Sequence, residues 1–138
     1  MTGKQILVIV AILLTGMLIW LVRNRDAKTE PSAYKVGALY SITDEKGYRI
    51  AKVLVIEDDV IHVRVYKQAF SERPATIDPS NLTLGTIHDA DGFGMGHLPI
   101  NPRKFDSWRP AFLMDTTLAE DELEGYREWK AAGGGVWD

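Results

Sequence analysis

The chain contains no cysteine, and this absence removes several classes of protein at once. Disulfide frameworks, zinc sites built on thiolates, cysteine nucleophiles and lipid attachment through a cysteine are all excluded. The sequence also shows no internal repeat, no P-loop and no serine in a nucleophile elbow. Basic charge is sparse: from Arg23 onward, 15 Lys and Arg face 19 Asp and Glu, a net charge of −4. That balance argues against nucleic-acid binding, which needs a concentrated basic face.

Charge is missing altogether from the segment Ile6–Val22. Twelve of its seventeen residues are Leu, Ile or Val. As a helix the segment would be roughly 26 Å long, close to the hydrocarbon thickness of a bilayer. Because it is longer than the apolar part of a signal peptide and no small-x-small cleavage pattern follows it, we predict an uncleaved transmembrane anchor over residues 1–25.

Basic residues flank the predicted transmembrane helix unevenly. Lys4 precedes the helix, whereas Arg23, Arg25 and Lys28 follow it. The positive-inside rule therefore favours a cytoplasmic position for the rest of the chain, by a margin of about one charge that leaves a periplasmic position open. We expect a single-pass protein of a bacterial inner membrane.

The remaining chain predicts a short linker and one α+β domain. Residues 26–33 are polar, contain Pro31 and show no period, so they are expected to be a linker, and residues 34–138 the domain. A capping box at Thr117–Glu120 and helical spacing of apolar residues predict a C-terminal helix over about residues 117–132. Alternating patterns predict strands at Tyr34–Ile42, Tyr48–Glu57, Val60–Lys67 and Asn81–Ile87, and the short apolar run Ala111–Met114 predicts a last strand. We expect a small antiparallel domain resembling a partly open SH3-like barrel closed by that helix.

The clearest local prediction is a hairpin that turns at Asp58 and Asp59. A two-residue loop pairs Glu57 with Val60 and Ile56 with Ile61; continued without interruption, it pairs Leu54 with Val63 and Lys52 with Val65. One face would then collect Leu54, Ile56, Ile61, Val63 and Val65 and belong to the core. The other face, with Val53, Val55, His62, Arg64 and Tyr66, is expected to be wetter or to be covered by a later segment.

A glycine-rich stretch between His88 and His97 is the most suggestive candidate for chemistry. Two His and two Asp lie within ten residues (His88, Asp89, Asp91 and His97), a composition that suits a metal site. The alternative is a structural or partner-binding loop whose Asp side chains bond to their own backbone. An EF-hand is excluded because two of its ligand positions are occupied by Phe93 and Ile100. No dinucleotide fingerprint and no catalytic triad can be recognised, so we expect no enzymatic activity, cofactor or bound metal.

The domain resembles small bacterial immunity-type proteins, which neutralise toxins by binding them. The resemblance is carried by the segment Tyr34–Lys67, the Asp91–Gly94 loop and the segment Glu124–Trp129. It implies a non-enzymatic inhibitor of a partner protein, placed at the membrane by its anchor. On the residues alone, six candidates are expected to contact a partner: His62, Arg64, Tyr66, Phe93, Met95 and His97.

Two other functions stay open from the sequence. The first is an accessory subunit of a membrane complex, in which Ala11, Thr15 and Gly16 let another helix approach closely. The second is a metal-dependent hydrolase that uses the His and Asp residues of the glycine-rich stretch.

Overall fold

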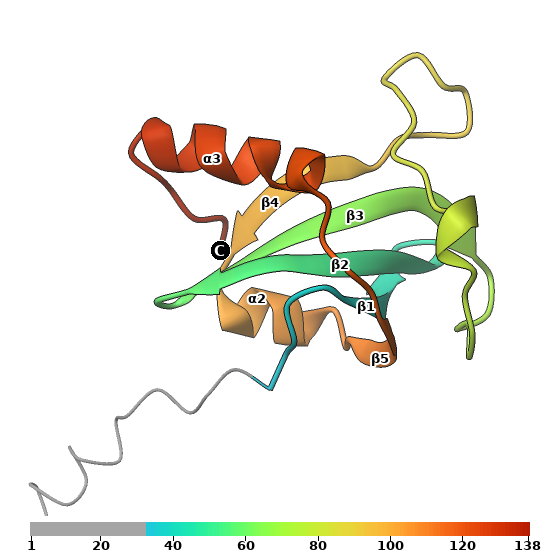
Figure 1. The fold of residues 1–138 in the computed structure, drawn as a ribbon. Coiled ribbons are helices and arrows are strands. Elements are labelled where there is room, and N and C mark those ends of the chain that lie inside the picture. Colours follow the sequence, from blue (N-terminus) through green and yellow to red (C-terminus); the bar gives the residue numbers. More distant parts are fainter. Residues whose placement is uncertain (1–32) are drawn as a thin grey trace, which may run out of the picture. The chain divides into compact units, whose positions relative to one another are not determined.

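Residues 33–138 are described by the computed structural model, and within them five strands form one antiparallel sheet (Figure 1). The strand order is β4-β3-β2-β1-β5. The strands are β1 (Ala38–Asp44), β2 (Gly47–Glu57), β3 (Val60–Phe70), β4 (Met95–Ile100) and β5 (Ala111–Asp115). With the C-terminal helix α3 (Glu124–Ala131), this confirms the predicted α+β class.

The predicted anchor at Ile6–Val22 lies outside the described residues. Tyr34–Asp138 forms one compact unit. Among residues 33–138, no helix has the length and apolar character needed to cross a bilayer.

The predicted hairpin turn is confirmed, and its register changes a few residues further on. Glu57 pairs with Val60, and Asp58 takes the left-handed conformation (φ 49°) that this kind of turn requires. A β-bulge between Val53 and Val55 then shifts the pairing, so Val53 lies opposite Val63. The predicted pairs of Leu54 with Val63 and Lys52 with Val65 are therefore wrong, as is the outward placement of Val53. A bulge adds one unpaired residue, which an uninterrupted alternation cannot foresee.

One face of the sheet carries the larger core, and the short helix α2 (Pro102–Ser107) covers it (Figure 1). Phe105 of α2 is fully buried there, with its ring edge-to-face against Tyr40. The helix begins where Asn101 accepts a hydrogen bond from the backbone N–H of Lys104 at 2.8 Å. The sheet contributes Ala38, Tyr40, Ile42, Ala51, Val53, Ile61, Val63, Val65 and Ile100 to this core.

The opposite face is also buried, by segments that come later in the chain. Leu39, Ile50 and Tyr66 pack there against the apolar residues Phe70, Ile77, Leu82, Leu84, Leu113 and Met114. α3 covers the part of the face near β4 and β3 (Figure 1). The expectation that the His62, Arg64 and Tyr66 face is covered late is thus met for His62 and Tyr66, which are buried.

The fourth strand lies elsewhere than predicted. The 3-10 turn η1 (Pro79–Asn81) and a loop occupy the predicted strand Asn81–Ile87, and β4 instead occupies Met95–Ile100, where no strand is predicted. Isolated backbone bonds, such as Lys67 N to Thr83 O at 2.9 Å, and two bonds between Gln68 and Thr83 hold the loop to β3. β4 tolerates Pro99 because it is an edge strand of the sheet.

The C-terminal helix also begins later than its sequence signal. The 3-10 turn η2 (Glu120–Leu123) leads into α3, and Ala119, not Thr117, is the residue before the first turn. The Glu122 carboxylate accepts the backbone N–H of Ala119 at 2.9 Å, which is the return bond of a capping arrangement shifted by two residues.

Candidate functional site

The six predicted contact residues fall on two adjacent strands and the loop before the second. His62, Arg64 and Tyr66 belong to β3, whereas Met95 and His97 belong to β4 and Phe93 to the loop. Pairing of β3 with β4 brings the two sets together: His62 Nδ1 lies 2.9 Å from His97 Nε2, and Arg64 Nε donates to Gly96 O at 3.1 Å. Sequence spacing gave no sign of this proximity.

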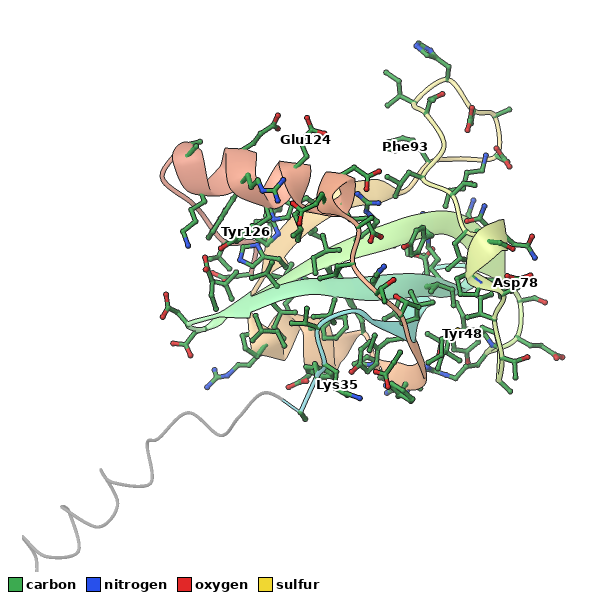
Figure 2. All side chains as sticks on the ribbon, in the orientation of Figure 1. Lys35, Tyr48, Asp78, Phe93, Glu124 and Tyr126 are labelled. Atoms are coloured by element: carbon green, nitrogen blue, oxygen red, sulfur yellow. The ribbon has the colours of Figure 1, made fainter. Side chains whose placement is uncertain are left out.

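The histidine pair is a buried cluster under α3. The two imidazole rings are stacked, with their centroids 5.2 Å apart. Tyr126 and Trp129 of α3 pack edge-on against the His62 ring, at 4.8 and 4.5 Å between centroids. Figure 2 shows Tyr126 between α3 and the strands. His62 is fully buried, and among the described residues its Nε2 has no hydrogen-bond partner.

Burial and charge keep the histidine pair neutral at physiological pH. Burial, followed by the neighbouring His97, lowers the pKa of His62 to about 4, against the weaker pull of Glu57, whose Oε1 lies 4.0 Å from His62 Nε2. Burial also lowers the pKa of His97. Two neutral imidazoles can share one hydrogen bond, with one ring donating and the other accepting. The pair therefore suits packing under α3, where His62 is fully buried.

Glu57 connects α3 to the hairpin at the border of this cluster. Its Oε2 accepts from the Tyr126 hydroxyl at 2.7 Å and from Lys130 Nζ at 3.0 Å. These two bonds hold the pKa of Glu57 below its usual range. Glu57 therefore fixes the position of α3 on the hairpin.

Close packing of α3 on β4 predicts that Gly125→Ala destabilises the fold. A Cβ at position 125 would lie 2.6 Å from the Cβ of His97. Alanine improves helix propensity by up to about 1 kcal/mol, but overpacking costs about 1–3 kcal/mol. We expect a net loss in the free energy of unfolding, measured by urea titration. Gly96→Ala is the matched control, because its Cβ would meet only Leu84 Cδ1 at an ordinary 3.6 Å; an equal loss there would contradict the packing argument.

A second polar cluster lies further along the same face of the sheet. Lys52 is 5% exposed, and its ammonium donates to Thr117 O at 2.8 Å and to both oxygens of Glu122 at 2.9 and 3.0 Å. Burial alone would raise the pKa of Glu122, but the bonds from Ala119 and Lys52 outweigh it and lower that pKa. Sequence reasoning missed both Lys52 and Glu122. The available signal was a lysine in the middle of an apolar strand.

The loop before β4 is held in place while its apolar side chains stay outside. Lys67 Nζ bonds to Asp89 at 3.0 Å and to Asp91 at 2.8 Å, and Arg49 Nη2 donates to Phe93 O at 3.0 Å. Phe93 is nevertheless 48% exposed and Met95 49% exposed. Figure 2 shows Phe93 on this loop, beyond the end of α3.

The residues of the proposed metal site are divided between two places. Asp89 and Asp91 pair with Lys67, whereas His97 pairs with His62. Over residues 33–138, no group of three or more His, Asp or Glu side chains is arranged to hold a metal ion.

Comparison with known proteins returns no relative. No protein-family model, no curated protein and no solved structure matches the chain. The class that the fold itself defines is a small α+β domain with a five-stranded antiparallel sheet.

Proposed function

We propose that this chain is a membrane-anchored, non-enzymatic protein-binding module, of the immunity type that neutralises a toxin. The observation that carries the proposal is the pair Phe93 and Met95, which stay half-exposed at the end of a loop and the start of β4, where the loop's backbone and carboxylates are held by hydrogen bonds. Aromatic and Met side chains held outside the core are enriched at the centre of protein interfaces. A preordered loop also loses little conformational entropy on binding.

The same proposal gives the sheet its finer description, a partly open SH3-like barrel. Three facts support it: β1 to β4 follow one another as neighbours, β5 returns to the free side of β1, and a short helix connects β4 to β5. Both sheet faces are covered. The loop with Phe93 precedes an edge strand, where a partner can reach it.

Site-specific cross-linking tests the contact surface. A photoreactive phenylalanine analogue at position 93 of the full-length protein in membranes should give one adduct of defined mass. The same analogue at Glu124, which is exposed on α3, should give none. Equal labelling from both positions would contradict a specific surface at the loop.

The substitution Phe93→Asp should reduce the amount of partner recovered by about tenfold or more, since central interface aromatics contribute about 2 kcal/mol or more. The measurement is quantitative co-purification from membranes. Phe112→Asp is the matched control, because Phe112 is 54% exposed on the distant edge strand β5. Unchanged recovery with Phe93→Asp, or equal loss with Phe112→Asp, would argue against the loop. For an immunity role, a toxin gene should lie beside the gene of this chain; expression of the wild-type chain should restore growth of cells that produce that toxin, and Phe93→Asp should not.

Removal of residues 1–25 separates this proposal from the accessory-subunit alternative. A binding module keeps its affinity for the partner without the anchor, because the contact is made by the loop. A subunit that assembles through Ile6–Val22 leaves its complex when that segment is deleted. The truncated chain should also leave the membrane fraction.

A further inference from the structure

A pocket of about 440 Å³ opens on the sheet face that carries the second core. Leu39, Lys52, Arg64 and Tyr66 form its floor, and Leu82 and Glu122 contribute to opposite walls. The pocket exists because two separate segments cover this face and leave a gap between them: the loop around η1 and the stretch from Thr116 to η2. Its volume is within the range of sites for small molecules or for one side chain of a partner.

The floor of this pocket holds hydrogen-bond donors that the described part of the chain leaves unused. Lys52 is saturated by Thr117 and Glu122. Arg64 uses only its Nε, toward Gly96, while Nη1 lies 3.7 Å from Glu122, beyond hydrogen-bond distance. Tyr66 is 8% exposed, and its hydroxyl makes no hydrogen bond to any residue of 33–138. The hydroxyl oxygen is not fully buried, so from the lining of the pocket it can donate to an acceptor on a ligand.

The charges around the pocket select one kind of acceptor. Lys52 and Arg64 share the single carboxylate of Glu122, at 2.9 and 3.7 Å, so these three side chains together carry one positive charge. Asp121 adds a negative charge at the rim. A planar monoanion matches the single guanidinium and accepts two parallel hydrogen bonds from it. A dianionic phosphate would be repelled by the carboxylates of Glu122 and Asp121.

We propose that this pocket binds a carboxylate, which accepts hydrogen bonds from the Arg64 guanidinium and the Tyr66 hydroxyl while its apolar part packs on Leu39 and Leu82. Arg64 and Tyr66 are two residues apart on β3, so their side chains lie on the same face of the sheet and their Cα atoms are about 7 Å apart. One carboxyl-bearing group can span this distance. The natural source of the carboxylate is an Asp or Glu side chain of the partner, or a free small acid. The first of these sources rests on the proposed function, whereas the site itself does not.

Titration with a small aromatic acid tests the site without any partner protein. The probe is phenylacetate, added to full-length protein in detergent micelles, with binding followed by NMR of labelled Arg and Tyr side chains. We expect saturable binding with shifts at Arg64 and Tyr66. Uncharged phenylacetamide should bind at least about tenfold more weakly, since a hydrogen bond to a charged group is about twice as strong as a neutral one. Dianionic phenyl phosphate should also bind at least about tenfold more weakly, because the carboxylates of Glu122 and Asp121 repel its second charge.

Three variants identify the groups responsible. Tyr66→Phe keeps the ring and should weaken phenylacetate binding about threefold to tenfold, and Arg64→Gln by about tenfold or more. Arg73→Gln is the control, because Arg73 lies over the Tyr48 ring and does not line the pocket. The dispersion of the amide spectrum checks that each variant is folded. Equal affinity of Tyr66→Phe and wild type, tighter binding of phenyl phosphate, or absence of saturation would each overturn the proposal.

Two further experiments identify the source of the carboxylate and distinguish failure of the pocket from failure of the proposed function. An acetylated, amidated peptide with a single Glu should bind more tightly than phenylacetate if the natural ligand is a partner side chain, and more weakly if it is a free acid; both outcomes support the site. Phe93→Asp should leave phenylacetate binding unchanged. Unchanged partner recovery with Phe93→Asp, while phenylacetate still binds to the wild type, would therefore count against the loop surface alone. Loss of partner recovery with Phe93→Asp, while phenylacetate fails to bind to the wild type, would count against the pocket alone.

Discussion

Acidification from pH 7 to pH 5 should lower the free energy of unfolding by about 2 kcal/mol through His62 alone. Burial lowers the pKa of His62 to about 4 in the folded protein, whereas an unfolded histidine titrates near 6.5. The unfolded chain therefore takes up a proton that the folded chain resists, so this contribution to stability is complete above pH 6.5 and is lost as the pH falls toward 4. The lowered pKa of His97 acts in the same direction.

Urea unfolding of the full-length protein in micelles, followed by tryptophan fluorescence, measures this effect. Trp129 lies against the His62 ring and reports release of α3. His62→Phe should remove most of the pH dependence between pH 7 and 5, whereas His88→Gln should leave it intact because His88 is exposed. The range ends at pH 5 so that Glu57, whose pKa is lowered, remains ionised. An NMR titration of His62 in the wild-type protein with a midpoint near 6.5 would disprove the argument even if the variant failed to fold.

Removal of the Glu122 charge should strongly destabilise the domain. Glu122→Gln leaves the buried ammonium of Lys52 without a counter-charge, and loss of one partner from a buried ion pair costs about 3–5 kcal/mol. The replacement of both partners should cost much less, because Lys52→Met with Glu122→Leu removes the buried charge and the desolvation it requires. Thermal or urea unfolding of the single and double variants gives the comparison.

The control for this prediction is another glutamate of the same turn. Glu120 pairs with Arg127, but its side chain is 87% exposed, so Glu120→Gln should change the free energy of unfolding by about 0.5 kcal/mol or less. A similar loss for Glu120→Gln and Glu122→Gln would mean that the buried ion pair with Lys52 is not the cause of the destabilisation. A double variant as unstable as Glu122→Gln would contradict the charge argument.

Local patterns predicted the elements whose causes lie within a few residues. The Asp58–Asp59 turn follows from two alternating runs separated by two residues, and the last strand and the C-terminal helix from short apolar and helical spacing. The helical segment begins with the turn η2 at Glu120 and not at Thr117, and the Glu122 carboxylate that caps this turn at Ala119 also accepts a bond from Lys52 on β2. Of the two local signals, the one that forms thus also has a tertiary partner.

Contacts between distant parts of the chain could not be predicted from the sequence. The alternation of apolar residues is clearer at Asn81–Ile87 than at Met95–Ile100, where Gly96 and Pro99 interrupt it, so the sequence predicts the fourth strand at the wrong place. An edge strand needs hydrogen bonds on one side only, so a weak pattern is sufficient. The contact between His62 and His97 exists only because β3 pairs with β4, the strand whose position the sequence did not predict.

The sequence by itself determined the class of the domain, the hairpin turn and the residue types available for binding, because these depend on periodicity and on chemistry that each residue carries with it. Only the tertiary structure decided which polar groups are buried and which remain unused. Burial depends on which later segment covers a strand, and for His62, Lys52 and Tyr66 those covers come from η1, η2 and α3, all of which follow β3 in the chain. Their chemistry therefore follows from the fold and not from their neighbours in sequence.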